Sequence, residues 1–337
     1  MKILALICFE LFITVNCFCQ QAGISLIPQP VSMIKGTGSY VFPSTITIAV
    51  SNDPHLVKIQ KMLATQIEAA SGRKVQSLIG QSANPANNIS LAIVIDNTIP
   101  KEGYRLQVNA TGVSLKASNA AGIFYGVQTL LQLFPIEIES RSAIATNWTI
   151  PFVTIEDYPR FGWRGIMLDV VRHWFTKEQV KDFIDDMVRF KFNMLHLHLS
   201  DDQGWRIEIK SLPKLTDTGA WRANRTGRWG DFTKPTPDEP KDYGGFYTQE
   251  DMKELIKYAQ ERYVTILPEI DVPGHSLAAV ASYPELTCTT DSSYQVNAGE
   301  RFMIWPGNGT FYGILDNTLC PANEKVYEFL DKVFTEI

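Results

Sequence analysis

Carboxyl side chains stand at the ends of three apolar, strand-like segments of this sequence. The segment NMLHLHLSDDQGWR, residues 193–206, alternates apolar and polar positions and then reaches Asp201 and Asp202. Asp169 ends RGIMLDV, and Glu269 and Asp271 end VTILPEID. Sugar hydrolysis needs an acid for the leaving oxygen and negative charge beside a developing oxocarbenium ion. We therefore expect these carboxyl groups to line a site for a polar substrate.

The two adjacent carboxyl groups of Asp201 and Asp202 are not expected to face the same pocket. Successive side chains of an extended chain point to opposite sides. One of the two therefore faces the site, and the other holds the loop that begins at Gln203 and Gly204.

Further polar side chains follow the same strand-like segments. Arg172 can fork two hydrogen bonds to the vicinal hydroxyls of a sugar, or it can pair with Asp169. Asp271 and His275 flank a Pro-Gly turn, and a carboxylate near an imidazole can set the tautomer and charge of the ring. For each of these residues, the spacing alone leaves the functional and the structural role open.

Two histidines on one face of the second segment raise the question of a metal. His196 and His198 share a face with Ser200, and a His-x-His pair at a strand end is found in metal-dependent hydrolases. The chain has five histidines, and near the third segment only His275 could join them. We favour hydrogen-bonded histidines inside a sheet, with no metal and no cofactor. A metal-dependent barrel hydrolase that uses His196 and His198 remains the alternative.

From Val153 onward, apolar strands alternate with amphipathic helices, which predicts a parallel sheet with helices outside it. Strands are expected at residues 164–170, 193–200 and 264–270, with helices capped by Thr176 and Thr248. In a (β/α)8 TIM barrel, the carboxyl ends of the strands form the catalytic face. Three strands cannot close such a barrel, and the last helical pattern is still in register at Ile337. We expect an α/β barrel domain, residues 153–337, truncated after about three βα units.

Residues 22–152 are expected to form a small α+β domain. Strands are expected at residues 40–50, broken by Pro43, at 89–95, and at 104–115 with a bend at Thr111-Gly112. One helix should end at Gly72, and another should run from Asn119 to Leu133. This part contains no acid pair, no metal-ligand spacing and no glycine-rich loop, so we expect it to be non-catalytic.

The first twenty residues have the pattern of a secretory signal peptide, in which Lys2 precedes a short apolar run. Export to the periplasm, the medium or the cell surface follows, with a lipoprotein attached through Cys17 or Cys19 as a variant. No other segment is long and apolar enough to span a membrane. The net charge of -5 and the absence of a concentrated basic face argue against nucleic acid as a partner.

Two cysteines, Cys288 and Cys320, lie outside the leader. In an exported protein they are expected to form a disulfide that closes the loop between them. Two buried free thiols are the alternative.

Long segments of the chain resemble the family-twenty glycoside hydrolases, the β-N-acetylhexosaminidases. The catalytic-domain resemblance lies in WRGIMLDVVRHW, KFNMLHLHLSDDQGWRIEIK, YGGFYTQEDMKELIKYAQERY and VTILPEIDVPGHS. IPQPV and AGIFYGVQTLLQLF resemble the non-catalytic N-terminal domain of that family. The resemblance implies removal of terminal β-linked N-acetylglucosamine or N-acetylgalactosamine from oligosaccharides or glycoconjugates. Configuration would be retained, because the substrate's own acetamido oxygen attacks the anomeric carbon.

The resemblance also implies roles for single residues. Arg172 matches the arginine that binds the hydroxyls of the terminal sugar. Asp201 and His275 match the pair networked with the general acid, and Asp271 matches a support of that network. The acid glutamate and the orienting aspartate belong to a His-x-Gly-Gly-Asp-Glu motif, which the 337 residues do not contain. We therefore expect the 337-residue chain to be inactive, and a non-catalytic carbohydrate-binding remnant is the rival hypothesis.

Overall fold

The computed structural model describes residues 23–80, 88–225, 232–289, 293–300, 303–304, 312–313 and 316–337. The leader expected at residues 1–20, with Cys17 and Cys19, lies outside the described residues. Within the described ranges, no helix has both the length and the apolar character needed to cross a bilayer.

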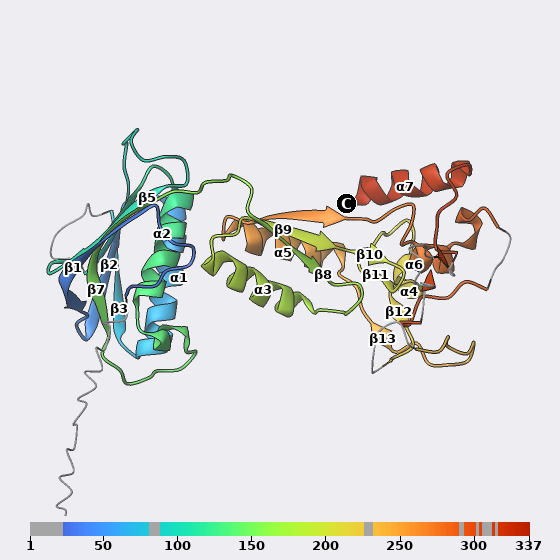
Figure 1. Cartoon of the computed structure of the whole chain (residues 1–337), viewed down its shortest axis with the longest axis horizontal. Helices are drawn as coiled ribbons and strands as arrows, with labels where there is room; N and C mark the ends of the chain where they lie inside the picture. Colours follow the sequence, from blue (N-terminus) through green and yellow to red (C-terminus); the bar gives the residue numbers. More distant parts are fainter. Residues whose placement is uncertain are drawn as a thin grey trace, which may run out of the picture.

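The N-terminal part is built on a seven-stranded sheet of order β1-β7-β5-β6-β4-β2-β3. Helices α1 and α2 contact each other and both pack on this sheet (Figure 1). The strands are β1 (Ser32–Val41), β2 (Thr45–Val50), β3 (Lys74–Ile79), β4 (Ile89–Ile93), β5 (Tyr104–Asn109), β6 (Gly112–Ala117) and β7 (Thr149–Asp157). The helices are α1 (Pro54–Ser71), α2 (Ala120–Leu133) and the 3-10 turn η1 (Ile136–Glu139).

Helix α1 ends at the predicted Gly72, and α2 spans the predicted residues. Asp53 caps α1 by accepting from the backbone N–H groups of His55 and Leu56. Gly72 ends α1 in the left-handed region at φ 65°, which glycine adopts without a steric penalty. Asn119 caps α2 by accepting from the N–H of Gly122.

The strand predictions for this part were less complete. The single bent strand expected at residues 104–115 is wrong: β5 and β6 form an antiparallel hairpin that turns at 110–111. There, the Asn109 side chain accepts from the N–H of Thr111, and Gly112 takes φ 136°. Strand β1 was not predicted between 32 and 39, because most of its side chains are exposed and show no apolar alternation. Strand β7 continues past residue 152, where the sequence places the domain boundary, because it pairs with both β1 and β5.

The second part contains the three predicted parallel strands, in the order β14-β9-β8. Apolar side chains on one face of this sheet, including fully buried Leu195 and Leu197, belong to the core. Figure 1 shows α3 and α5 along this sheet. The elements are β8 (Gly165–Asp169), α3 (Lys177–Arg189), β9 (Met194–His198), α5 (Gln249–Gln260) and β14 (Thr265–Glu269).

The second part contains further elements, most of them short. They are β10 (Ser200–Asp201), β11 (Gly204–Trp205), α4 (Lys214–Asp217), β12 (Trp221–Arg222), β13 (Tyr243–Gly244), α6 (Leu277–Ser282), η2 (Pro284–Leu286), β15 (Met303–Ile304), β16 (Tyr312–Gly313) and α7 (Glu324–Glu336). Cys288 and Cys320 form the expected disulfide, with a Cα–Cα distance of 4.9 Å. It joins the chain after η2 to the chain before α7.

Capping boxes begin both helices of the strand–helix repeats. The Thr248 hydroxyl accepts from the N–H of Asp251, and the Asp251 carboxylate accepts from the N–H of Thr248. Thr176 and Gln179 make the same reciprocal contact at α3. These contacts satisfy backbone donors that the helix itself leaves without a partner.

Replacing Thr248 by alanine is expected to lower the free energy of unfolding by about 1 kcal/mol, because the first turn of α5 loses its acceptor. Urea denaturation followed by circular dichroism measures this change. Thr248→Ser keeps the hydroxyl and should stay within about 0.5 kcal/mol of the wild type. A serine variant as unstable as the alanine variant would rule out the capping explanation.

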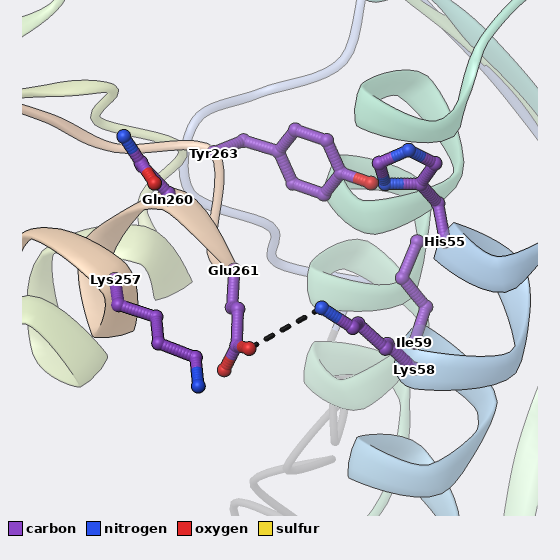
Figure 2. Close-up of a pocket in the computed structure, with 7 residues that line it drawn as sticks. All are labelled: His55, Lys58, Ile59, Lys257, Gln260, Glu261 and Tyr263. Atoms are coloured by element: carbon purple, nitrogen blue, oxygen red, sulfur yellow. Dashed lines mark hydrogen bonds and ion pairs between the residues drawn. The ribbon is translucent and has the colours of Figure 1, made fainter.

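One buried and one exposed ion pair connect the N-terminal part to the strand–helix repeats. Lys191, Asp157 and Tyr104 form a buried cluster: Lys191 Nζ is 2.8 Å from Asp157 Oδ2 and 2.9 Å from the Tyr104 hydroxyl. Lys58 of α1 pairs with Glu261 beyond α5 at 3.3 Å, and the Lys58 side chain is 61% exposed (Figure 2).

A pocket of about 270 Å³ lies beside the Lys58–Glu261 pair. The α5 side chains of Figure 2 come from the C-terminal end of that helix, which leads into the start of β14. The pocket is lined by His55, Lys58, Ile59, Lys257, Gln260, Glu261 and Tyr263. None of the predicted site residues lines it, so the candidate site must be sought at the opposite ends of the strands.

Candidate active site

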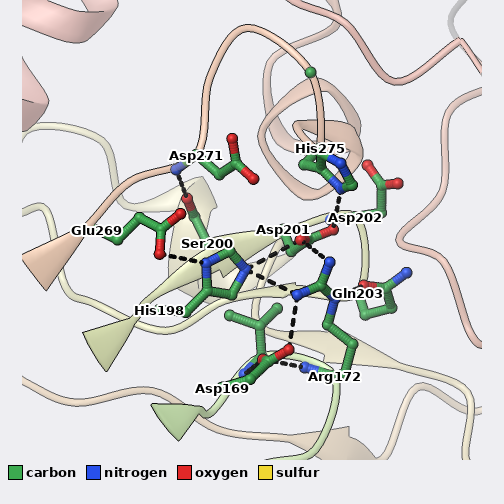
Figure 3. Close-up of polar contacts among 12 residues, drawn as sticks. Asp169, Arg172, His198, Ser200, Asp201, Asp202, Gln203, Glu269, Asp271 and His275 are labelled. Atoms are coloured by element: carbon green, nitrogen blue, oxygen red, sulfur yellow. Dashed lines mark hydrogen bonds and ion pairs between the residues drawn. The ribbon is translucent and has the colours of Figure 1, made fainter. Parts of the chain in front are cut away.

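The register of the three parallel strands brings their terminal polar residues into one row. Asp169 of β8 lies opposite His198 of β9, and His198 lies opposite Glu269 of β14. Two residues earlier, His196 is flanked in the same way by Met167 and Leu267. Because parallel strands end at the same edge, residues far apart in the sequence meet here. Figure 3 shows the resulting cluster.

Asp201 is the centre of this cluster, and its side chain is completely buried. Its Oδ2 atom forms an ion pair with Arg172 Nη2 and lies 3.0 Å from His198 Nε2. Its Oδ1 atom lies 3.1 Å from His275 Nδ1 and accepts from the N–H of Asp202. A carboxylate removed from water is stable only when it is paired and hydrogen-bonded, and Asp201 meets both conditions.

Asp202 makes different hydrogen bonds from Asp201, but one of its carboxylate oxygens lies within 4.8 Å of an Asp201 carboxylate oxygen and a His275 ring nitrogen, so the two acids do not face opposite sides as the alternation predicts. The Asp202 carboxylate accepts from the N–H of Leu277 at 3.1 Å and from Asn317 Nδ2 at 2.8 Å. Its backbone oxygen accepts from the N–H of Asn297. Burial raises the pKa of Asp202 above its usual range. Asp202 therefore holds the start of α6 and the residues around 297 and 317 against the site.

Arg172 contacts more groups than the sequence suggests. Its Nη1 atom pairs with Asp169 Oδ2 at 2.7 Å, and its Nε donates to Gln203 Oε1 at 3.1 Å. Burial alone would raise the pKa of Asp169, but hydrogen bonds from Arg172 and from the N–H of Val171 lower it. The Arg172 side chain is still 33% exposed, so part of the guanidinium can meet a ligand. Pairing with Asp169 and binding a ligand are therefore compatible.

His198 and His196 both contact Glu269. His198 Nδ1 lies 3.1 Å from Glu269 Oε2, and His196 Nε2 lies 2.5 Å from the same oxygen. Burial would lower the pKa of His198, but hydrogen bonds with Asp201 and Glu269 outweigh burial and raise it. No sequence pattern indicates the contact between Glu269 and the two histidines, since it depends on the register of β9 and β14.

The metal hypothesis for this cluster is weakened by the arginine. Ligand-type atoms of His198, Asp201 and Asp271 lie within 4.8 Å of one another. However, the guanidinium of Arg172 already supplies a cation to Asp201, and Glu269 already engages both His196 and His198. His198 thus has a hydrogen bond to Asp201, and both histidines have an ion-pair contact with Glu269.

Asp271 and His275 lie on the loop that follows β14. The N–H of Asp271 donates to the Ser200 hydroxyl at 3.0 Å, which fixes the start of this loop against β10. His275 adopts φ 53°, an uncommon backbone conformation for a residue other than glycine, and its side chain is 50% exposed. Its ring thus joins buried Asp201 to the open side of the cluster. Strained backbone of this kind is common at functional sites.

A buried arginine holds the loops around the site. Arg206 is fully buried and stacks near Trp174, at 5.7 Å from the ring centre. Burial lowers the pKa of Arg206 to about 10. Its guanidinium donates to four backbone carbonyls, those of Val171, Gln203, Ala220 and Gly245. The loops after β8 and β9 are therefore fixed to each other through one side chain that no site motif identified.

Comparison with known proteins gives two family matches. Residues 161–337 match the model of glycosyl hydrolase family 20, catalytic domain, and residues 23–158 match glycosyl hydrolase family 20, domain 2. The boundary between the two matches follows β7, beyond residue 152.

Similar proteins cover nearly the whole chain. A beta-hexosaminidase of Porphyromonas gingivalis is 38% identical over 94% of this chain, and an N,N'-diacetylchitobiase of Vibrio harveyi is 31% identical over 94%. The chain spans 37% and 35% of the lengths of these two relatives. The structure of Streptomyces plicatus N-acetyl-beta-hexosaminidase in complex with Thio-NAglucal matches with TM-score 0.78 and 36% identity, over 92% of this chain and 56% of that chain.

Proposed function

The chain belongs to glycosyl hydrolase family 20, and we propose that the natural protein is an exo-acting β-N-acetylhexosaminidase. Its substrates would be oligosaccharides or glycoconjugates that end in β-linked N-acetylglucosamine or N-acetylgalactosamine. The single observation that supports this most strongly is the geometry of Asp201. Its buried carboxylate connects Arg172 and His275 at the carboxyl ends of parallel strands.

The proposed reaction retains configuration and uses the substrate's own acetamido group. The acetamido oxygen attacks the anomeric carbon, and a general acid protonates the leaving oxygen. Attack from within the substrate is favoured by its high effective concentration. In this scheme, Arg172 binds hydroxyls of the terminal sugar through its exposed part. Asp201 orients His275, and His275 supports the general acid.

The general acid itself is not assigned to a residue of this chain. The family resemblance places it in a His-x-Gly-Gly-Asp-Glu motif, and the 337 residues contain no Gly-Gly-Asp-Glu sequence. We propose that the residues described above supply the sugar-binding and supporting part of the site. The 337-residue chain alone would then bind substrate without turning it over.

Two further proposals concern the architecture of the protein and its location in or outside the cell. We propose that residues 161–337 contribute about three βα units to a TIM-barrel catalytic domain. The N-terminal α+β domain would end after β7 and carry no catalytic group. We further propose that residues 1–20 are removed as a signal peptide and that the protein is secreted, periplasmic or displayed on the cell surface.

An assay of the natural gene product on aryl glycosides tests the proposed activity. An aryl N-acetyl-β-glucosaminide should be hydrolysed at least about 10³-fold faster than the matching aryl β-glucoside, because the glucoside lacks the attacking acetamido group. The 337-residue chain should give less than about 10⁻² of the turnover of the natural product, since a missing general acid alone costs about 10²–10⁴-fold.

Two results would contradict parts of this proposal. Equal rates on both glycosides would exclude substrate-assisted catalysis. If the natural gene product binds N-acetylglucosamine but hydrolyses neither glycoside, the rival role as a carbohydrate-binding protein holds instead.

A further inference from the structure

His198 and Glu269 form a second acid–base pair, which contacts Asp201 through its Oδ2 atom. The His198 side chain is 2% exposed, with Nε2 at 3.0 Å from Asp201 Oδ2 and Nδ1 at 3.1 Å from Glu269 Oε2. The ring therefore lies between two carboxylates, one beside each nitrogen (Figure 3). Resting on the proposed function, we propose that Glu269 and His198 are positioning residues: they hold Asp201, and through it His275, in the arrangement that glycoside hydrolysis needs.

The position of the ring between two carboxylates favours a doubly protonated His198. Its Nε2 atom forms a hydrogen bond with Asp201 Oδ2, whereas Nδ1 lies at ion-pair distance from Glu269 Oε2 without hydrogen-bond geometry. A neutral imidazole has one N–H and can offer a proton to only one carboxylate, whereas an imidazolium offers one to each. With a neutral ring, one nitrogen lone pair would face a carboxylate oxygen across about 3 Å in a buried site, which is repulsive. The raised pKa of His198, described above, agrees with this geometry.

The charged and titratable groups around His198 come from every neighbouring strand. They are Asp169 and Arg172 beyond β8, Asp201 in the turn after β9, Glu269 and Asp271 beyond β14, and His196 through Glu269. Arg172 Nη1 is also 3.1 Å from His198 Nε2, but it has Asp169 Oδ2 as an acceptor at 2.7 Å. Arg172 therefore does not require a lone pair on His198, and the ring can donate to Asp201.

Each member of the pair has a separate task. Glu269 is fixed by His196 on one side and by the strand end on the other, so it anchors the His198 ring. His198 and Arg172 together hold Oδ2 of Asp201, which leaves Oδ1 facing His275 Nδ1. Loss of the His198 proton would remove one of the contacts that hold Asp201, next to Arg172 and the N–H of Asp202, and would weaken the orientation of His275.

Nuclear magnetic resonance of the natural protein, with histidine labelled at the ring nitrogens, tests the charge of His198. The signal that disappears in His198→Gln identifies the residue. It should show a doubly protonated ring at pH values where a free imidazole is already neutral. Glu269→Gln should move this transition to lower pH, because one carboxylate partner loses its charge. His55→Gln, on α1 of the N-terminal part and outside the cluster, is the control and should leave the doubly protonated state in place.

Steady-state kinetics on an aryl N-acetyl-β-glucosaminide test the effect on the reaction. Glu269→Gln and His198→Gln should each lower kcat by about 10–100-fold, with KM within about twofold, because a small misplacement of supporting groups has this effect. The protonated ring is the working form, so activity falls as pH rises through the pKa of His198. Glu269→Gln should bring that fall to lower pH. The control His55→Gln should change kcat by less than about threefold.

The two measurements separate failure of this proposal from failure of the proposed function. A protein that hydrolyses no N-acetylhexosaminide but shows a doubly protonated His198 sensitive to Glu269→Gln would support the pair and refute the function. An active protein would support the proposed function. If its His198 titrates as a free histidine, or if kcat is unchanged in both Glu269→Gln and His198→Gln, the proposed role of Glu269 and His198 is refuted.

Discussion

Replacing Asp201 by asparagine is expected to lower kcat on an aryl N-acetyl-β-glucosaminide by about 10³-fold in the natural protein. Asparagine keeps the shape of the side chain but removes the charge that Arg172, His198 and His275 share. Its amide group would also place N–H donors where the carboxylate accepts. KM should rise by less than about tenfold, because Asp201 is completely buried and has no surface for a sugar.

Asp202→Asn is the matched control for this experiment. The two aspartates are adjacent and both buried, yet the Asp202 carboxylate accepts its hydrogen bonds from Leu277 and Asn317 and not from Arg172 or the histidines. We expect kcat to stay within about fivefold of the wild type and the free energy of unfolding to fall by about 1–3 kcal/mol. Stopped assays and urea denaturation of both variants separate the two effects. Similar losses of kcat in both variants would show that this turn acts only through stability.

Replacing Lys191 by methionine is expected to lower the free energy of unfolding by about 3–5 kcal/mol, because it leaves Asp157 buried without its cation. Lys191, Asp157 and Tyr104 are 6%, 8% and 2% exposed. Burial lowers the pKa of Lys191, although Asp157 opposes that shift. The lysine takes φ 62°, and methionine meets the same backbone cost there, so the comparison isolates the charge.

Two further variants make the Lys191 result specific. Lys191→Met combined with Asp157→Asn removes both charges and should recover at least half of the lost stability. Lys58→Met breaks the exposed pair that connects the same two parts of the chain, and it should cost less than about 1 kcal/mol. Urea denaturation measures the free energy of unfolding of all three variants, and equal m-values make these energies comparable. A double variant no more stable than Lys191→Met would mean that packing of the lysine stem, and not its charge, stabilises this contact.

Local features of this fold follow from the sequence alone. The alternation of strands and helices, the caps at Thr176 and Thr248, and the helix stop at Gly72 depend on neighbours within a few residues. The exposed strand β1 and the hairpin between β5 and β6 were not predicted, because no apolar alternation marks the first and a two-residue turn resembles a bend in the second.

The candidate site was predicted in its members but not in its connections. The sequence by itself determined that acids stand at three strand ends. Only the tertiary structure decided that Asp201 faces Arg172, His198 and His275, and that Glu269 contacts His196 and His198. It also decided that Lys191 and Asp157 meet in a buried cluster. The physical reason is that these partners are brought together by strand register and by packing between distant segments, which neither spacing nor alternation along the chain encodes.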